Sequence, residues 1–296
     1  MVAPLRAGRN VTRDPLIVVG AGRSGTNALR DVLTGLDAFG TWPCDEINYV
    51  WRHGNRDHNT DELTIAHATP EVARYIQSVF ARQQRKIGGA TLVEKTCANS
   101  LRVGFVNTAV PDARFVHITR DARDVVSSAM QRWTAPLDLP YILRKARFVP
   151  RSDLPHYATL YLRSRLSRGR SEDKRLSSWG PRFESLDRLV EKKTPLHEIC
   201  AHQWSACVER ALTDFDRIDP GRQMHVSYRD LVTNAEAVVS QIGAFAGHDL
   251  PAGDVRRATD ALHKGSLGAW KSRLTPQQIA DIETICGPLM TQLDPA

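Results

Sequence analysis

Short apolar runs rich in β-branched residues alternate along this chain with longer stretches that have the spacing of helices. The runs are LIVV at 16–19, TLVE at 91–94, RFVHIT at 114–119 and QMHVS at 223–227, with a weaker candidate, AFGTW, at 38–42. Helical spacing is found between them, for example over Thr69–Arg85 and Ala122–Trp133. Strands that alternate with helices are typical of βαβ units. The sequence therefore predicts an α/β fold with a central parallel sheet flanked by helices.

Composition narrows the class of protein. The 296 residues are 42% apolar and 25% charged, as in soluble globular proteins. Five scattered cysteines without a CxxC pair exclude a disulfide framework and a zinc site. The first 15 residues lack the apolar core of a signal peptide, and no stretch approaches the roughly 20 apolar residues of a membrane span. We therefore expect a cytoplasmic protein with no metal and no membrane span.

Charge is distributed unevenly. The whole chain carries +7, but the stretch 144–193 holds 14 lysines and arginines against 6 acidic residues, a net +8. This stretch belongs to the least regular part of the chain, residues 134–194, which is rich in Pro, Arg and Ser. We interpret 1–296 as one domain and 134–194 as an insertion or lid over the ligand edge of the sheet. The alternative is an ordinary solvated surface.

A glycine-rich loop follows the first run, in IVVGAGRSGTNAL at 17–29. Glycine after a strand brings backbone N–H groups close to an anion. The spacing Gly20-x-Gly22-x-x-Gly25 fits a dinucleotide fingerprint, but the acid that this requires after the next strand is lacking, since Asp37 precedes that strand. A nucleoside-triphosphate loop needs a lysine where Thr26 stands, which argues against a kinase or ATPase.

A third interpretation places the cation inside the loop. Arg23 precedes Ser24-Gly25-Thr26, and successive N–H groups at a helix start form an anion-binding nest. This suits a 5′-phosphate that carries one further anionic group. A tight glycine turn without a ligand is the remaining alternative.

A second cluster lies in RFVHITRDARDVVSSAMQRW. Arg120 ends a predicted strand, where ligands of parallel sheets bind, and Ser128 follows eight residues later inside a helix that Asp121 or Asp124 can cap. Both side chains can reach one anion. Alternatively, Arg120 and Arg123 form surface ion pairs with the two aspartates.

Together, the two clusters resemble the sulfotransferase family, which uses 3′-phosphoadenosine 5′-phosphosulfate (PAPS) as its donor. Loops of the form RSGTT or KSGTT hold the 5′-phosphosulfate in that family, and the pattern R-[DN]-x-[RK]-D-x-x-x-S binds the 3′-phosphate. The resemblance implies a three-layer fold like that of P-loop NTPases. It assigns the 3′-phosphate to Arg120 and Ser128, and the 5′-phosphosulfate to Gly22, Arg23, Ser24, Gly25, Thr26 and Asn27, where Asn27 replaces the second threonine.

Two later segments also resemble this family and occur in its order. SYRDLVTNAEAVVSQIGAFAG, which predicts a capped helix ending at Gly247, contains Tyr228, which the resemblance places near the adenine. HKGSLGAWKSRLT resembles R-K-G-x-x-G-x-W-K and implies that Lys264 and the backbone of Gly265 close over the 3′-phosphate. His263 replaces the usual arginine.

The resemblance also suggests the catalytic groups. In VEKTC, Lys95 matches the lysine of E-K-[ST] and K-T-H segments and is expected at the bridging oxygen or sulfuryl group. The histidine that aryl sulfotransferases use as base is replaced by Cys97, which excludes their mechanism. Glycan enzymes use a glutamate in E-[IL]-H-F, which E-I-N-Y resembles. We expect Glu46 as the base and Asp45 as the second choice, with His53 and His58 in reserve.

The sequence therefore predicts a cytoplasmic sulfotransferase whose catalytic residues are Glu46, Lys95 and Arg23, with no metal and no nucleic-acid partner. The acceptor is a hydroxyl, with a carbohydrate favoured over a lipid, a peptide tyrosine or a secondary metabolite. Trp42, Tyr49 and Trp51 are candidates to stack on its ring. One rival is a dinucleotide-dependent oxidoreductase, which has no use for the second cluster. The other is a non-catalytic polyanion-binding protein, which predicts salt-sensitive binding without nucleotide.

Overall fold

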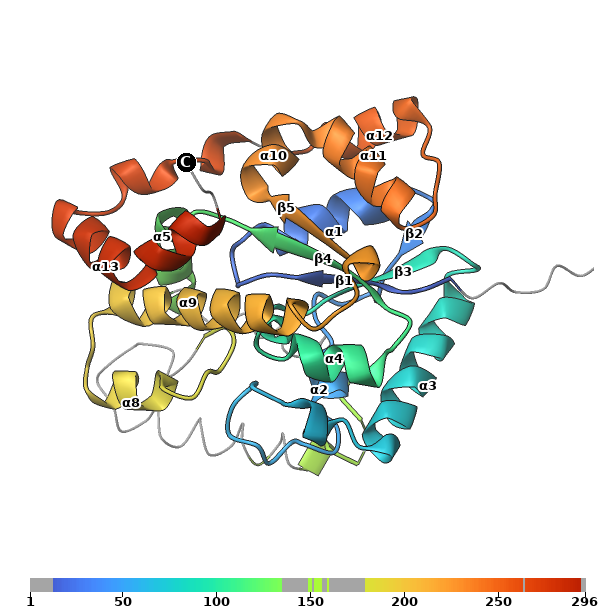
Figure 1. Ribbon diagram of the computed structural model, residues 1–296, viewed down its shortest axis with the longest axis horizontal. Coiled ribbons are helices and arrows are strands. Elements are labelled where there is room, and N and C mark those ends of the chain that lie inside the picture. The colour runs from blue at the N-terminus through green and yellow to red at the C-terminus, as the bar shows by residue number, and fades with distance from the viewer. Residues whose placement is uncertain are drawn as a thin grey trace, which may run out of the picture.

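A five-stranded sheet forms the centre of the protein, in the order β2-β3-β1-β4-β5 (Figure 1). The computed structural model describes residues 13–134, 149–150, 152–155, 159, 179–262 and 264–293. Every neighbouring pair of strands is parallel. The strands are β1 (Leu16–Val19), β2 (Phe39–Gly40), β3 (Thr91–Lys95), β4 (Arg114–Thr119) and β5 (Gln223–Ser227). The predicted parallel α/β sheet is confirmed, and its five runs are the strands.

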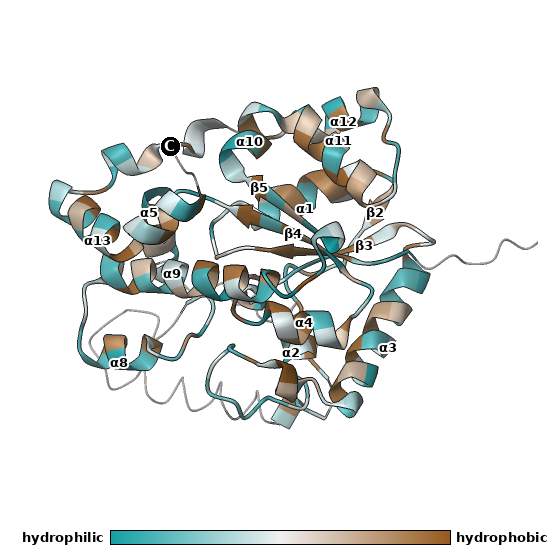
Figure 2. Ribbon diagram, viewed as in Figure 1, coloured by the Kyte–Doolittle hydropathy of each residue, from teal (hydrophilic) through white to brown (hydrophobic). Residues whose placement is uncertain are grey.

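Both faces of the sheet are buried. Leu16 and Val18 of β1 point to one face and Ile17 and Val19 to the other, and all four are fully inaccessible to solvent. A strand covered on both faces consists of a continuous apolar run instead of alternating apolar and polar residues. The brown colour of β1 in Figure 2 shows this hydrophobicity.

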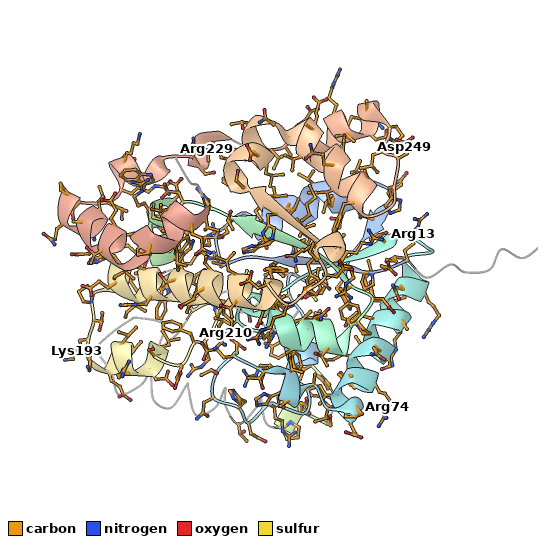
Figure 3. All side chains as sticks on the ribbon, in the orientation of Figure 1. Arg13, Arg74, Lys193, Arg210, Arg229 and Asp249 are labelled. Carbon is orange, nitrogen blue, oxygen red and sulfur yellow. The ribbon has the colours of Figure 1, made fainter. Side chains whose placement is uncertain are left out.

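Helices cover the two faces as separate layers. Residues of α1, α10, α11 and α12 pack on the face of Leu16 and Val18, and residues of α2, α3, α4 and α9 on the face of Ile17 and Val19. Side chains fill the space between sheet and helices on both sides (Figure 3). The predicted three-layer architecture is confirmed. The helices of these layers are α1 (Thr26–Thr34), α2 (Asn48–Trp51), α3 (Pro70–Lys86), α4 (Val103–Ala109), α9 (Leu196–Phe215), α10 (Tyr228–Thr233), α11 (Ala235–Phe245) and α12 (Ala252–Thr259).

A further group of helices extends the core beside the sheet. The helices α5 (Ala122–Trp133) and α13 (Pro276–Leu293) pack on α9, with α8 (Leu186–Glu191) at its margin. Short 3₁₀ turns complete the described elements: η1 (Ile65–His67), η2 (Cys97–Leu101), η3 (Pro220–Arg222), η4 (Lys264–Ser266) and η5 (Ala269–Ser272).

The start of α5 resolves an alternative left by the sequence. Asp121 is the N-cap, because its carboxylate accepts a hydrogen bond from the backbone N–H of Arg123 at 2.8 Å. Asp124 lies inside the first turn and is buried, so it serves another purpose. The helix ends at Trp133, as predicted.

Most of the predicted insertion at 134–194 lies outside the described residues, so its role as a lid stays a prediction. The described part that matters for the site is the stretch 179–182. The amide of Gln203, on α9, donates to the carbonyls of Trp179 and Pro181 at 2.8 and 2.9 Å. Among the helices that the structure describes, none has the length and apolar character needed to cross a membrane.

Candidate active site at the carboxyl edge of the sheet

Parallel strands end at the same edge, and this edge holds the predicted site. The glycine loop follows β1, Lys95 ends β3, Arg120 follows β4 and Tyr228 follows β5. They surround a cavity of about 840 Å³. Ligands of open α/β sheets bind at this edge. The cavity is lined by Gly22, Arg23, Gly25, Thr26, Asn27, Ala28, Asp45, Glu46, Asn48, Tyr49, Asp61, Lys95, Cys97, Ala98, Arg120, Ser128, Gln131, Arg132, Trp179, Gly180, Pro181, Tyr228, Ser266 and Arg273.

Neighbouring atoms lie so close to the loop backbone that two of its positions require glycine. A Cβ on Gly20 would lie 2.6 Å from the carbonyl oxygen of Ile118 in β4. Gly25 has φ +98°, and a Cβ there would lie 2.2 Å from the ring of Tyr228. Gly25 precedes α1, so the free amides at the helix start face the cavity edge. The loop therefore has a backbone that suits the predicted anion-binding nest, and the binding itself stays a prediction.

Arginines converge beside this nest. Nε of Arg23 donates to Oγ of Ser128 at 2.9 Å, and Arg120 donates to the carbonyl of Arg23 at 3.2 Å. Burial, together with the guanidinium groups of Arg132 and Arg120, lowers the pKa of Arg23. Nε of Arg120 is buried and has no hydrogen-bond partner among the described residues. A cluster of cations with an unsatisfied donor fits an anionic ligand.

Tyr228 packs against this group of arginines. The guanidinium of Arg120 lies over its ring at 4.3 Å, and its hydroxyl lies 2.7 Å from Oγ of Ser266. Gly265 is exposed next to Ser266. The side chain of Lys264 and all of His263 lie outside what the structure describes. Ser24 is buried beneath the loop instead of lining the cavity, and its amide donates to the carbonyl of Ala21.

The other end of the cavity holds one cation between two carboxylates. Nζ of Lys95 lies 2.9 Å from Oε1 of Glu46 and 3.3 Å from Oδ1 of Asp45. Glu46 also accepts from the backbone N–H of Cys97 at 3.3 Å. Asp45 is bound in addition by Arg30 of α1, at 2.5 Å. The predicted lysine and both predicted carboxylates are therefore brought together.

Protonation states follow from this arrangement. Burial opposes the charge of Lys95, but nearby negative groups, among them the carboxylates of Glu46 and Asp45, outweigh it and raise the pKa of Lys95. Burial raises the pKa of the Cys97 thiol to about 12. Lys95 is therefore an ammonium and Cys97 a neutral thiol, packed 3.6 Å from Oγ1 of Thr26.

The three candidate stacking residues separate. Tyr49 lines the cavity. Trp42 and Trp51 are core residues, 7% and 0% exposed, whose rings meet that of Phe80 edge-on. They cannot stack on an acceptor, because they belong to the cluster between the sheet and α3.

The two reserve histidines lie away from the cavity lining. Nδ1 of His53 lies 2.8 Å from Oδ2 of Asp153, and its ring packs on Tyr75 at 3.9 Å. His58 contacts Thr60 and belongs to a separate hollow. Neither is placed to take a proton in the cavity.

Several lining residues escaped the sequence analysis. Trp179 packs against the loop, since a Cβ on Gly22 would lie 3.3 Å from its ring. Asp61 is buried, binds Arg52 at 3.0 Å and accepts from the backbone of Arg182. No local pattern marks these residues, because contacts between distant segments place them here. In the sequence, Trp179 lies in the stretch 134–194, which is distinguished only by its Pro-, Arg- and Ser-rich composition.

The structure argues against a dinucleotide site, because the candidate for its ribose-binding acid, Asp37, lies in the wrong place. Asp37 is exposed and precedes β2, so it lies toward the amino end of that strand and outside the cavity lining. A ribose-binding acid belongs at the carboxyl end.

The comparisons with known proteins agree with this geometry. The profile described as "Sulfotransferase family" matches residues 15–159 and 174–252. No curated protein sequence matches the chain.

Solved structures share the fold. A sulfotransferase domain from the curacin biosynthetic pathway aligns at TM-score 0.56 and 13% identity, covering 94% of this chain and 98% of that one. The sulfotransferase STF9 from Mycobacterium avium aligns at TM-score 0.56 and 14% identity, covering 96% and 77%. A sulfotransferase from Alicyclobacillus acidocaldarius aligns at TM-score 0.51 and 16% identity, covering 96% and 95%.

The profile spans more than half of the chain, and its match includes the glycine loop, the Lys95 segment and the Arg120–Ser128 cluster. The cation-lined cavity suits a donor with two anionic groups. The chain belongs to the sulfotransferase family and is a PAPS-dependent sulfotransferase.

Proposed function

We propose that this enzyme transfers the sulfuryl group of PAPS to a carbohydrate hydroxyl, with Glu46 as general base. The donor supplies an activated sulfuryl group and leaves as 3′-phosphoadenosine 5′-phosphate (PAP). Arg120 and Ser128, with Lys264 and the backbone of Gly265, bind its 3′-phosphate. Backbone amides of the 22–27 loop bind the 5′-phosphosulfate, and Tyr228 contacts the adenine. Arg23, Arg120 and Arg132 lie close together at one end of the cavity. This cluster of cations supports the proposed orientation of the donor, with its 3′-phosphate at that end.

Arg23 is proposed to serve both ends of the donor. It was expected as a catalytic group, and its backbone lies in the phosphosulfate loop with φ +74°. Its side chain reaches Ser128. A guanidinium in this place can neutralise negative charge on the bound donor. Positioning and charge neutralisation are the main contributions of enzymes that transfer phosphoryl-like groups.

The reaction at the other end involves Lys95 and Glu46. Glu46 accepts the proton of the acceptor hydroxyl as that oxygen forms a bond to sulfur. The bond between sulfur and the bridging oxygen of the phosphate breaks in the same step. Lys95, which remains an ammonium, stabilises the negative charge on the leaving oxygen. The observation that carries this proposal is the 2.9 Å contact between Nζ of Lys95 and Oε1 of Glu46 inside the donor cavity.

Glu46 is preferred to Asp45 because their partners differ. Asp45 is held by Arg30 through both its side chain and its backbone carbonyl, at 2.5 and 3.0 Å. A carboxylate bound to an arginine is a weak base. Glu46 is bound by the ammonium of Lys95 and by the backbone N–H of Cys97. Asp45 remains the second candidate.

The acceptor side of the cavity supports a carbohydrate. The polar side chains of Asn48, Tyr49 and Asp61 line it, and Trp179 offers an aromatic face. Sugars present hydroxyls at their edges and C–H groups on their faces, which suits such a mixture. A lipid, a peptide tyrosine or a secondary metabolite would use it less completely.

Location and the covering segment are also proposals. The odd number and scattered positions of the five cysteines, with no CxxC pair, support a reducing compartment such as the cytoplasm. The basic segment 134–194 is proposed to cover the acceptor, because its described end at Trp179–Pro181 lines the cavity.

Transfer of labelled sulfate from PAPS tests the function. The acceptor panel comprises 4-nitrophenyl glycosides, a tyrosine peptide, a long-chain alcohol and 4-nitrophenol. We expect sulfation of a glycoside, lost in Glu46→Gln. Sulfation of the phenol or peptide alone would overturn the acceptor class. Tighter calorimetric binding of ATP or NAD than of PAP would overturn the donor.

A further inference from the structure

A buried carboxylate next to the proposed 3′-phosphate site has no part in the reaction above. Asp124, on α5, is 3% exposed and accepts two backbone hydrogen bonds from a segment 144 residues away. Its Oδ2 accepts from the N–H of Gly268 at 2.9 Å, and its Oδ1 from the N–H of Trp270 at 3.2 Å. Through these two hydrogen bonds, the side chain of Asp124 connects α5 to the loop 264–270.

The backbone of this loop is shaped to reach Asp124. Gly268 has φ +68°, a left-handed conformation that glycine adopts without strain. It precedes the η5 turn, so the amides of Gly268 and Trp270 point toward one acceptor. A Cβ at Gly268 would meet only Cε of Lys271, at 4.0 Å, so the conformation itself, not crowding, requires glycine here.

Residues around Asp124 bind the same loop. Arg120 donates to the carbonyl of Ser266, and one of its nitrogens lies 3.7 Å from Oδ2 of Asp124. The guanidinium of Arg123 lies over the ring of Trp270 at 4.4 Å. The R-D-A-R-D motif is thus attached to the loop at its first, fourth and fifth positions, while Asp121 caps the helix.

The negative charge of Asp124 indicates that it does not bind the phosphate directly. A carboxylate beside a dianionic phosphate is repelled by it, so it would weaken binding if it acted alone. Here both oxygens are covered by amides, and the adjacent guanidinium of Arg120 offsets the charge. The same carboxylate fixes the loop and orients Arg120, whose Nε has no partner among the described residues.

We propose that Asp124 is a positioning residue that holds the loop 264–270 closed, and so makes the donor site selective for a nucleotide with a 3′-phosphate. This rests on the proposed placement of the 3′-phosphate at Arg120, Ser128, Lys264 and Gly265. Lys264 and Gly265 begin the loop that Asp124 fixes. Without Asp124, the amides of Gly268 and Trp270 lose their acceptor, and the loop separates from α5. The 5′-phosphate contacts lie on another segment, 22–27, and stay intact.

Calorimetry with PAP and with adenosine 5′-phosphate tests this proposal, because the two ligands differ only in the 3′-phosphate. We expect Asp124→Asn to weaken PAP binding by about tenfold or more, on the scale of one lost charge-assisted contact. Adenosine 5′-phosphate should bind within about twofold of wild type. Asp214→Asn is the matched control, since its carboxylate also accepts a backbone amide, that of Gly104 at 2.8 Å, but lies outside the cavity lining.

Hydrogen exchange supplies a readout that does not depend on affinity. In the unliganded Asp124→Asn protein, the amides of Gly268 and Trp270 should exchange faster than in wild type. If Asp124→Asn does not fold, as judged by thermal unfolding, Gly268→Ala replaces it. That change strains the left-handed backbone while leaving Asp124 in place, and should give the same selective loss.

Equal losses for the two nucleotides, or an unchanged PAP affinity despite faster exchange, would overturn the positioning role. A wild-type protein that binds PAP no more tightly than adenosine 5′-phosphate would overturn the donor site itself. These failures are distinguishable, since the second is seen before any substitution is made.

Discussion

The ammonium nitrogen of Lys95 lies 2.9 Å from the carboxylate of Glu46 and 3.3 Å from that of Asp45, at the carboxyl end of β3. The three groups differ in exposure: the Lys95 side chain is 1% exposed, and those of Glu46 and Asp45 are 22% and 28% exposed. The cation is therefore fixed within the protein while both carboxylates face the cavity. A buried ammonium with two carboxylate partners keeps its proton, which leaves proton acceptance to the acids.

Replacing Glu46 and Asp45 one at a time should show which of them is the general base. Glu46→Gln is expected to lower kcat by about 10²–10⁴, the usual contribution of general base catalysis. Asp45→Asn should lower kcat by less than about tenfold, because Arg30 and Lys95 can still bind an amide oxygen. Steady-state kinetics with saturating PAPS, with PAP affinity as control, measures both. A larger loss in Asp45→Asn would transfer the role of base to Asp45.

Lys95→Met should lower kcat by about 10²–10³, the usual loss when a donor to developing negative charge is removed. PAP affinity should stay within a few-fold of wild type, because Lys95 acts on the leaving oxygen. The raised pKa of Lys95 adds a pH test: the ammonium form persists beyond the usual value of 10.5, so its deprotonation gives no loss of activity below that pH. A decline in kcat between pH 8 and pH 9 that Lys95→Arg abolishes would contradict this assignment.

Cys97 should be dispensable for chemistry although it lines the cavity. Burial raises the pKa of its thiol to about 12, so it is neutral at physiological pH and cannot accept a proton. Cys97→Ser should retain kcat within about tenfold, the serine keeping a contact with Thr26. The pH dependence of kcat should also keep its shape. Loss of activity comparable to that of Glu46→Gln would show that the sulfur takes part.

The sequence predicted those parts of the fold and site that are encoded by local patterns. The five apolar runs became the five strands, because a parallel sheet buried on both faces needs continuous apolar segments. The start of α5 at Ala122 could be predicted from the helical spacing, whereas the sequence left Asp121 and Asp124 open as its N-cap. The site lies where the carboxyl ends of β1, β3, β4 and β5 meet, and glycine, lysine, arginine and tyrosine stand at those ends.

Features that depend on packing between distant segments could not be predicted in this way. Trp42 and Trp51 precede and follow the carboxylate pair, yet the turn around them directs both rings into the core against Phe80. Trp179 packs against Gly22 from a segment far away in the sequence, and Gln203 of α9 binds its carbonyl. The role of Asp124 was hidden because capping and pairing with Arg120 are equally consistent with its sequence position.

The buried Glu94 next to Lys95 predicts a pH-dependent stability. Its oxygens accept from Oγ1 of Thr96 at 2.6 Å and from Nδ2 of Asn99 at 2.9 Å. Burial nevertheless raises its pKa to about 7, against 4.5 for an ordinary glutamate. Between these values the folded protein binds more protons than the unfolded chain. The contribution of Glu94 to stability is therefore fully present below pH 4.5 and is lost as the pH rises through about 7.

Glu94→Gln removes this titration, and the difference in Tm between wild type and variant should reveal it. Wild type should lose stability relative to the variant between pH 5 and pH 8, by several degrees, since about 1 kcal/mol shifts Tm by roughly 2–4 °C in a domain of this size. Other titrating groups, such as His117, are shared and cancel in the difference. The exposed Glu191 on α8 provides the control, and Glu191→Gln should give a curve parallel to wild type. Parallel curves for Glu94→Gln as well would mean that Glu94 is ionised in the folded protein at pH 5.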